Sequence, residues 1–246
     1  FLPPLLRGER VGAWAYAEPD AGADVTRVRL RARREGSHYV LDGTKMFVEF
    51  AAGADLLITD DSGREIRLKA AARRIVTLAP HATEILYAAG AGERLVGTVE
   101  FSDYPPAAKK VPRVGSYERL DLEAISALKP DLVIAWETGN PAGQVEKLKA
   151  LGLTVYASQP NRMEDIAAQL ERFGQLAGSE AAAGVAARQF RQRLENLRHG
   201  NAQKPPVRVF YQIWTAPLMT VGGPQIISDA IRLCGGENVF GHLSQM

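Results

Sequence analysis

Short apolar runs alternate with helical segments over residues 73–136, and this alternation constrains the fold more than any other feature of the chain. The runs IVTLAP, LVGTVEF and LVIAW are separated by HATEILYAAG and DLEAISALK, which have helical periodicity. Such an alternation indicates βα units on a mostly parallel sheet, and therefore an α/β fold. Because ligands of open α/β sheets bind outside the carboxyl ends of the strands, the residues that follow these runs are candidates for a binding site.

Aromatic residues stand at the ends of the apolar runs. They are Phe101, Tyr117, Trp136 and Trp214. Rings at several strand ends could form a wall for a large, flat, apolar ligand, although a single aromatic residue at a strand end is more often part of the core. Asp103 and Tyr104 follow the first ring and can supply polar contacts. The two prolines after Tyr104 predict an extended, rigid loop that holds this residue at the edge of a cleft.

The motif SDYPP (residues 102–106), followed by a short basic loop and by LEAISALKPDLVIAW (residues 122–136), resembles the cobalamin-binding proteins of bacterial ABC importers. These belong to the larger class of metal-chelate binding proteins, whose other members take haem or siderophores. The similarity runs from about Thr59 to about Phe240. It implies cobalamin as transported ligand, an ABC transporter permease as partner and a periplasmic location. Haem or siderophore-iron is the alternative ligand.

The resemblance also implies roles for individual residues. The family positions that line the cleft correspond to Phe101, Tyr117, Trp136 and Trp214. The family often has tyrosine at position 101 and tryptophan at position 117, and both replacements keep a ring. Asp103 and Tyr104 would contact the ligand. Glu123 corresponds to a glutamate that pairs with a permease arginine, although an ordinary surface glutamate is also favoured in a first helical turn.

The resemblance divides the chain after residue 58 into lobe one (59–178), a connecting helix (179–200) and a partial lobe two (201–246). The connecting helix has an apolar stripe, which comprises Ala183, Ala186, Phe190, Leu194 and Leu197. In the family such a stiff helix joins the lobes and implies small opening motions. We expect the second lobe to be incomplete, and cobalamin to bind weakly as a result, at about micromolar or weaker affinity.

Residues 1–58 have the pattern of antiparallel strands, with turn signals between them and no helical segment. The turn AEPDAGAD (17–24) and the hairpin 39–45 resemble the middle β-domain of acyl-CoA dehydrogenases. The helical domains and catalytic carboxylate of that family have no counterpart here. We therefore expect a fused fragment rather than an FAD-dependent acyl-CoA dehydrogenase, which remains the alternative.

The totals and motifs favour a binding protein over an enzyme. A formal net charge of +2 over 246 residues gives no indication of nucleic-acid binding. The single Cys234 excludes an internal disulfide and a cysteine metal cluster. HExxH, GxSxG, Walker A and CxxC motifs are absent, so we predict no catalytic residues and no metal site. We expect a monomer without a signal peptide or a transmembrane helix.

Several local predictions follow from residue type. Asp121 is a natural N-cap for a helix at 122–128, and Asp60, Asp61 and Gly63 predict a hairpin turn. His81 begins a helix and could face the cleft as a ligating residue, but the interpretation as a capping or solvated histidine is favoured. We further predict strands at 95–101, 111–115 and 207–214, and a loop at 215–223.

Overall fold

The structure is a computed structural model that describes residues 31–35, 38–42, 56–116 and 118–244. The chain divides into two compact units, Phe1–Leu56 and Leu57–Met246. In the first unit, β1 (Arg31–Glu35) pairs antiparallel with β2 (His38–Asp42), which confirms antiparallel hairpin structure in this segment. The predicted turn at 17–24 and the end of the predicted hairpin, 43–45, lie outside the described residues.

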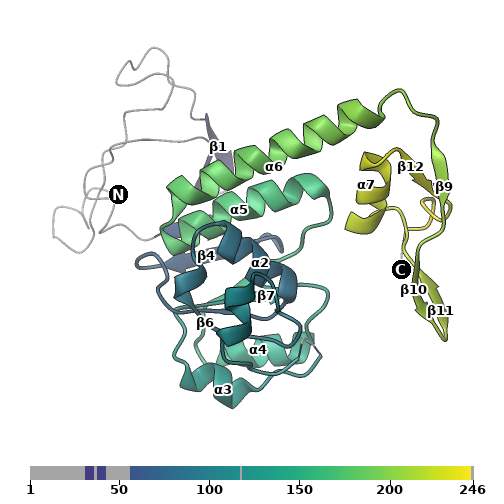
Figure 1. The fold of residues 1–246 in the computed structure, drawn as a ribbon. Coiled ribbons are helices and arrows are strands. Elements are labelled where there is room, and N and C mark those ends of the chain that lie inside the picture. The colour runs from purple at the N-terminus through teal and green to yellow at the C-terminus, as the bar shows by residue number, and fades with distance from the viewer. Residues whose placement is uncertain (1–30, 36–37, 43–55, 117, 245–246) are drawn as a thin grey trace, which may run out of the picture. The chain divides into compact units, whose positions relative to one another are not determined.

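Four parallel strands form the central sheet of the second unit, in the order β6–β5–β7–β8. They are β5 (Ile75–Thr77), β6 (Leu95–Thr98), β7 (Leu132–Trp136) and β8 (Val155–Ser158). The helices between and after them are α2 (Pro80–Ala88), the 3-10 helices Gly92–Arg94 and Pro106–Lys110, α3 (Leu122–Ala127), α4 (Ala142–Ala150) and α5 (Met163–Ala177). The predicted α/β fold is confirmed (Figure 1).

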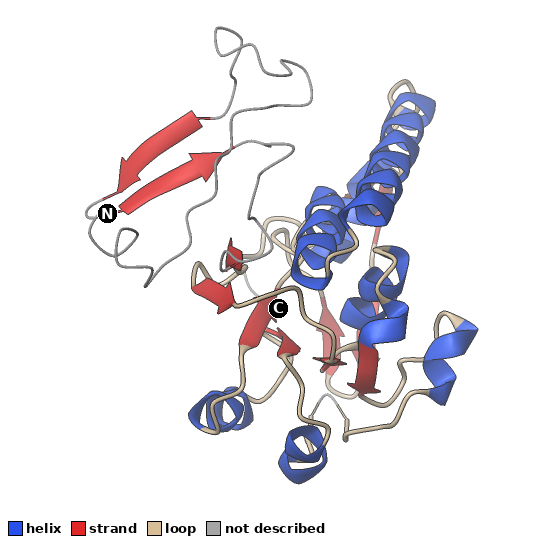
Figure 2. Cartoon of the chain, turned by 90° about the vertical axis from the view of Figure 1, so that its left-hand side faces the viewer, coloured by secondary structure: helices blue, strands red, loops and turns tan. Residues whose placement is uncertain are grey.

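The apolar strand β7 lies inside the sheet, and both of its faces are buried. Val133 packs in a core cluster with Ile125 of α3 and Leu148 of α4. Ile134 points to the opposite face because successive side chains of a strand alternate, and it is also fully buried. Helices therefore cover both faces of the sheet (Figure 2), which explains why β7 is apolar throughout.

Two predictions for the segment after β6 are wrong in detail. The strand expected at 95–101 ends at Thr98, and the strand expected at 111–115 is reduced to an isolated bridge between Thr98 and Arg113. Pro112 has no N–H for a continued ladder. The two prolines were expected to keep their loop extended, but Pro106 begins a 3-10 helix, since a proline is tolerated in the first turn of a helix. Asp121 caps α3 as predicted and accepts a hydrogen bond from the Ala124 amide at 2.9 Å.

The long helix α6 (Glu180–Asn201) returns alongside α5 after a tight turn at Gly178, whose φ is +62°. Ala183 and Leu194 of the predicted stripe are buried, but Ala187 is buried rather than Ala186, and Leu197 is 45% exposed. The stripe is therefore shorter than predicted. α6 extends beyond α5 and leads to the C-terminal part of the chain (Figure 1).

The C-terminal part contains two small sheets and one helix. β9 (Val207–Val209) pairs parallel with β12 (Gly236–Asn238), β10 (Gln212–Thr215) pairs antiparallel with β11 (Leu218–Thr220), and α7 comprises Ile226–Leu233. The predicted single strand 207–214 and loop 215–223 are wrong, because the chain changes pairing partner after Val209 and then folds back as a hairpin. α7 ends at Leu233 with Cys234 as its C-cap, and Gly235 follows with a φ of +79°, the left-handed conformation that glycine commonly adopts after a helix.

A hairpin of β3 (Leu56–Thr59) and β4 (Glu65–Leu68) places its turn against the end of β8. The predicted turn at Asp60, Asp61 and Gly63 is confirmed: Asp60 accepts hydrogen bonds from the amides of Ser62 and Arg64. The Asp61 amide donates to the Ala157 carbonyl at 3.0 Å, and the Ala157 amide donates to Asp60 Oδ2 at 3.1 Å. The turn thus extends the hydrogen bonding of the sheet. None of the helices in the described part of the chain is long and apolar enough to cross a membrane.

Candidate ligand-binding cleft

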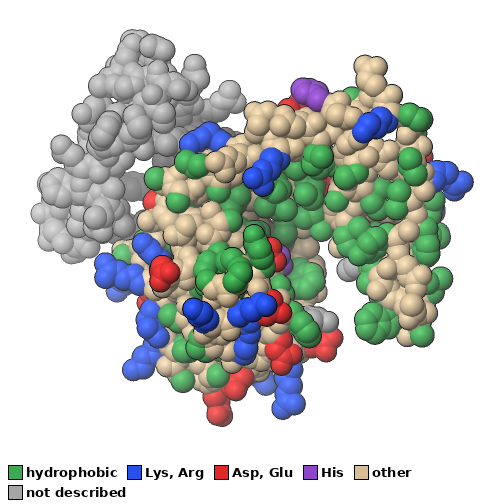
Figure 3. Space-filling model, viewed as in Figure 1, with side chains coloured by type: hydrophobic (Ala, Val, Ile, Leu, Met, Phe, Trp, Pro, Cys, Tyr) green, Lys and Arg blue, Asp and Glu red, His purple; other side chains and the backbone are tan. Residues whose placement is uncertain are grey.

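A cavity with a volume of about 670 Å³ lies at the carboxyl ends of the central strands. Loops that follow each of the four strands contribute a residue to it: His81 after β5, Tyr104 after β6, Trp136 at the end of β7, and Gln159 after β8. Ile166 and Leu170 of α5, Phe190 of α6 and Ile226 of α7 add apolar surface. Figure 3 shows the hollow below α6 with hydrophobic side chains along its walls. The size is typical of a ligand pocket.

Trp136 is held in place at one wall of the cavity by its own loop. Its backbone amide donates to Asn140 Oδ1 at 2.7 Å, and Asn140 Nδ2 donates to the Leu78 carbonyl at 2.9 Å. A Cβ atom at Gly139 would lie 1.9 Å from Cε3 of the Trp136 ring. Glycine at position 139 is therefore required for this position of the indole.

His81 forms the adjoining part of the wall. Its ring meets Trp136 edge to face, with centroids 5.6 Å apart and an interplanar angle of 82°. Its Nε2 atom lies 3.4 Å from Ser158 Oγ. Burial lowers the pKa of His81 from 6.5 to about 4, and the Asp61 carboxylate opposes this shift only in part. The imidazole is therefore neutral at pH 7. The favoured interpretation of a capping or solvated histidine is wrong, because the ring lies in the cavity and caps no helix.

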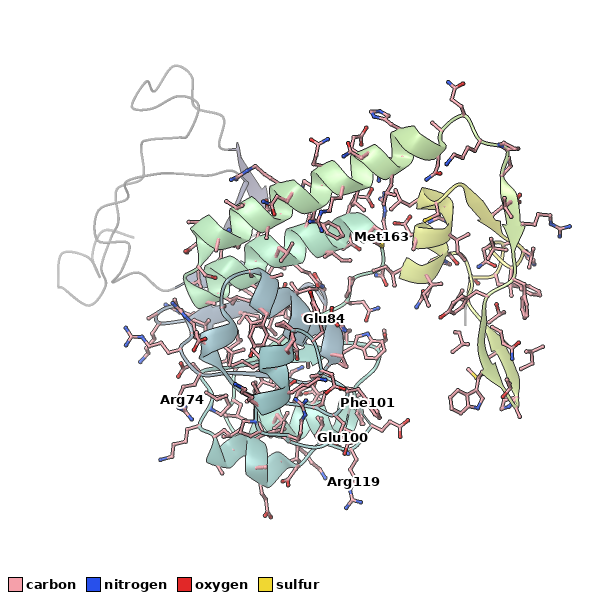
Figure 4. The ribbon with its side chains drawn as sticks, viewed as in Figure 1. Arg74, Glu84, Glu100, Phe101, Arg119 and Met163 are labelled. Atoms are coloured by element: carbon pink, nitrogen blue, oxygen red, sulfur yellow. The ribbon has the colours of Figure 1, made fainter. Side chains whose placement is uncertain are left out.

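Amide and hydroxyl side chains supply most of the polar lining. Gln159 Oε1 accepts hydrogen bonds from the Thr138 amide and hydroxyl at 3.2 and 2.9 Å, and Gln159 Nε2 donates to Asn161 Oδ1 at 3.1 Å. Gln225 caps α7 through its Oε1 atom, which accepts from the Ile227 amide at 2.7 Å, and its amino group has no partner among the described residues. The charged lining residue is Glu84 of α2 (Figure 4), and no lysine or arginine lines the cavity within the described residues.

Asp61 in the β3–β4 turn holds the polar lining residue Gln159 in place. Asp61 Oδ2 accepts hydrogen bonds from the Gln159 amide at 2.7 Å and from Gln169 Nε2 at 2.8 Å. Asp61 also pairs with Arg172 of α5. A carboxylate that joins the β8 end to α5 limits the movement of Gln159. No sequence pattern connects Gln159 with this turn.

Four buried hydroxyls lie below the SDYPP loop. Thr77 Oγ1 is 2.7 Å from Thr83 Oγ1 and 3.0 Å from Thr98 Oγ1. Thr98 Oγ1 donates to Ser102 Oγ at 2.9 Å. All four side chains are essentially inaccessible to solvent, so each hydroxyl satisfies another in a low-dielectric site. The cluster links β5, α2 and β6 to the first residue of the loop that carries Tyr104.

The predicted site residues fall into different positions. Tyr104 and Trp136 line the cavity. Phe101 and Trp214 are 70% and 61% exposed and are not among its lining residues. Asp103 is exposed and pairs with Arg113 at 3.2 Å, Tyr117 lies outside the described residues, and Glu123 is exposed in the first turn of α3.

Sequence reasoning missed the polar lining. Gln159 and Asn161 follow an apolar run in the same way as Trp136, so the rule of strand ends applied to them as well. Gln225 and Ser244 reach the cavity through the packing of the C-terminal part, and no local signal marks them. In the described part of the chain, no group of three or more His, Cys, Asp or Glu residues is arranged to hold a metal ion.

A parallel sheet with a ligand-sized cavity at its strand ends defines a binding protein of the α/β type, and residues 75–245 match the family described as Periplasmic binding protein. The chain belongs to this family of binding proteins. Over 169 residues it is 44% identical to the vitamin B12-binding protein of Vibrio cholerae serotype O1 (strain ATCC 39541), covering 69% of this chain and 61% of the relative. Over 170 residues it is 43% identical to the vitamin B12-binding protein of Yersinia pestis (strain Pestoides F), with the same coverage of 69% and 61%.

Solved structures show the same likeness. The periplasmic vitamin B12 binding protein BtuF of Vibrio cholerae superposes with a TM-score of 0.66 at 42% identity, over 71% of this chain and 70% of that one. A periplasmic heme binding protein from Pseudomonas aeruginosa gives a TM-score of 0.63 at 26% identity, over 68% and 62% of the two chains. The chain spans about 61% of the length of the curated relatives it matches.

Proposed function

We propose that this chain binds cobalamin in the cavity at the strand ends, as the substrate-binding component of an importer. The observation that carries the proposal is the composition of the lining. Rings of His81, Trp136 and Tyr104 stand beside the uncharged side chains of Thr138 and Gln159. A corrin ring is apolar on its faces and edged with amides, and amide side chains both donate to and accept from such groups. The vitamin B12-binding proteins among its relatives support the same ligand.

Haem is the second candidate ligand, because heme binding proteins are among the structural neighbours. Haem carries two carboxylates, which proteins usually bind with arginine or lysine. Within the described residues the cavity is lined by Glu84 and by neutral side chains, without a basic residue. A carboxylate beside Glu84 would be repelled rather than bound. The charge of the lining therefore favours cobalamin over haem and over acidic siderophores.

The exposed rings extend this proposal beyond the cavity. Phe101 and Trp214 are mostly exposed, so they remain accessible to a ligand larger than the cavity itself. We propose that they contact cobalamin together with Asp103, Tyr104 and Tyr117. The family relationship suggests these positions, and the affinity of variants tests them.

Membership of the family also suggests a partner and a location. We propose that the chain acts as a monomer in the periplasm and delivers cobalamin to the permease of an ABC transporter. Glu123, exposed on α3, would pair there with an arginine of the permease. Association with importer-containing proteoliposomes should be lost in Glu123→Ala, and unchanged association would remove Glu123 from this role.

We also propose a domain organisation for the chain. Residues 59–178 form lobe one, residues 179–200 form the connecting helix, and residues 201–246 belong to a second lobe. Residues 1–58 would be a fragment similar to the middle β-domain of acyl-CoA dehydrogenases, without flavin chemistry of its own. The visible spectrum tests this point, since a protein that binds FAD is yellow and this one should be colourless until cobalamin is added.

The test of the main proposal is calorimetric titration with cyanocobalamin, haemin and a ferric siderophore. We expect cyanocobalamin to bind most tightly. Trp136→Ala and Trp214→Ala should each weaken its binding by about 1–3 kcal/mol, the amount for loss of a large apolar contact. Leu151→Ala is the control, because Leu151 is 60% exposed and lies outside the cavity lining. Tighter binding of haemin, or unchanged cobalamin affinity in both folded tryptophan variants, would contradict the proposal.

A further inference from the structure

His81 has an arrangement of partners that neither the fold nor the proposed aromatic wall requires. Its Nε2 atom lies 3.4 Å from the hydroxyl of Ser158, which is fully buried at the end of β8. Its ring rests edge to face on Trp136. No other hydrogen bond to the ring occurs among the described residues, so Nδ1 has no such partner there. His81 lines the cavity. Its Nε2 atom thus has an oxygen partner, whereas its Nδ1 atom has none among the described residues.

A neutral imidazole carries one N–H and one lone pair. When Nε2–H donates to Ser158 Oγ, the lone pair resides on Nδ1. Histidines that ligate metals almost always donate their other ring N–H to a protein oxygen, which fixes the tautomer and the ring orientation. Burial keeps the ring unprotonated at pH 7, so a proton does not block the lone pair. The contacts of His81 therefore match those of a ligand histidine.

A metal chelate needs only one such side chain. The ring system of the ligand supplies the equatorial donors, and the protein has to supply a single axial donor. This explains how coordination can occur although the described part of the chain has no cluster of three metal-ligating side chains. Imidazole is a good donor for cobalt and iron.

We propose that Nδ1 of His81 coordinates the metal of the bound chelate at an axial position that carries an exchangeable ligand. The proposal rests on the proposed function, since it concerns the same cavity. In aquocobalamin the cobalt–oxygen bond to water breaks, a cobalt–nitrogen bond to His81 forms, and the water leaves to solvent. The oxidation state of cobalt does not change, and no proton is transferred. In cyanocobalamin the axial cyanide is held tightly, so His81 contributes only packing.

The experiment compares the visible spectra of aquocobalamin and cyanocobalamin bound to the full chain. Aquocobalamin should shift to the spectrum of an imidazole adduct, and cyanocobalamin should show no ligand exchange. In His81→Ala the shift should be lost, and aquocobalamin should bind at least about tenfold more weakly, which corresponds to about 1.4 kcal/mol. Cyanocobalamin affinity should fall by less than aquocobalamin affinity, because only the packing of the ring is lost, and circular dichroism shows that the variant folds. His81→Gln serves as a second variant without an imidazole.

His199→Ala is the matched control, because His199 is exposed on α6 and pairs with Glu195 at 3.1 Å outside the cavity. This variant should keep the spectral shift. A shift that persists in both His81 variants, or no shift in a wild-type chain that binds cyanocobalamin, would overturn the coordination proposal and leave the proposed function intact. If neither cobalamin binds, the proposed function fails. A His81-dependent low-spin haemin spectrum would then support axial coordination of another chelate, and its absence would overturn it.

Discussion

Phe101 combines a strained backbone with an exposed ring. Its φ is +63°, a left-handed conformation that bulky residues rarely adopt. The flanking backbone is fixed on both sides, by a hydrogen bond from the Glu100 amide to the Gly115 carbonyl at 2.9 Å and by Ser102, whose hydroxyl belongs to the buried cluster. The surroundings therefore hold Phe101 in a conformation that its side chain disfavours. Strain of this kind is concentrated at functional sites.

Replacement of Phe101 by glycine should separate stability from binding. Glycine adopts a positive φ freely, and the ring buries little surface, so Phe101→Gly should raise the unfolding free energy by up to about 1 kcal/mol. Phe101→Ala removes the same ring but keeps the strain, and it should not gain stability. Both variants should lose the same amount of cobalamin affinity. Urea denaturation and calorimetry check this, and a Phe101→Gly protein less stable than Phe101→Ala would show that strain is not the controlling factor.

His81 should make the folded state sensitive to acid. Its folded-state pKa of about 4 lies below the ordinary 6.5, so between these pH values the unfolded chain binds a proton that the folded chain does not. The stabilisation is fully present above pH 6.5 and is lost as the pH falls towards 4, by about 1.4 kcal/mol per pH unit.

Urea denaturation at several pH values, compared between the wild type and His81→Gln, measures this term. The difference between the two proteins should change across this window and level off above it. His199→Ala provides the control for an exposed histidine. A difference between wild type and His81→Gln that does not vary with pH would show that His81 titrates normally in the folded protein.

The two long helices are joined by close packing at small residues and by ion pairs. A Cβ atom at Gly174 of α5 would lie 2.3 Å from Cβ of Ala183 in α6. Arg191 of α6 makes two hydrogen bonds with Glu171 of α5, at 2.6 and 2.7 Å, and these raise the pKa of the Arg191 guanidinium. Exposed pairs of this type contribute little. The close approach at Gly174 is therefore the feature that sets the distance between the helices.

Two helical glycines give opposite predictions. Gly174→Ala should lower the unfolding free energy by about 1–3 kcal/mol, because α6 must move away from α5. Gly184→Ala should raise it by up to about 1 kcal/mol, since alanine favours a helix and the new methyl group meets only the flexible Arg188 side chain at 3.4 Å. Thermal denaturation of both variants checks this pair. Similar effects of the two substitutions would show that helix propensity, rather than packing, dominates at position 174.

Sequence periodicity predicted those helices and strands whose pattern of buried side chains can be read within one segment of the chain. The apolar run LVIAW predicted the strand that the structure shows as β7, and the helix expected at 122–128 is α3, Leu122–Ala127. The rule that ligands bind at strand ends correctly placed Trp136 and Tyr104 in the cavity, because both residues stand at or just after predicted strands. Trp214 was placed on a strand of the wrong length, since β9 and β10 are adjacent in sequence but pair with different partners. Which strand pairs with which depends on residues that are distant in the chain. The periodicity within one segment therefore cannot predict the pairing.

At the scale of the whole molecule, every described residue that lines the cavity belongs to the second unit, Leu57–Met246. A chain of residues 56–246 should therefore bind cobalamin with the affinity of the full chain, as measured by calorimetry. Circular dichroism of both chains controls for folding. Weaker binding by the shorter, folded chain would show that residues 1–55 contribute to the site.

The C-terminal part exposes much apolar surface, including Val207, Trp214 and Leu218, which are 65%, 61% and 66% exposed. Exposed apolar side chains of this size favour contact with ligands or with other chains. Within the described residues no third strand pairs with the hairpin β10–β11, so its edges there are available for strand pairing.

The helix α6 is a stiff connection between the two walls of the cavity. Its 22 residues form a rod of about 33 Å, and a bend of about 5° would move one end by only about 3 Å relative to the other. The two walls are the strand ends on one side and α7 on the other. A hydrogen bond from the Met163 amide to the Asp229 carboxylate of α7, at 2.8 Å, also connects them. Both features limit how far the strand ends and α7 can separate, so the width of the cavity should change little when a ligand enters or leaves.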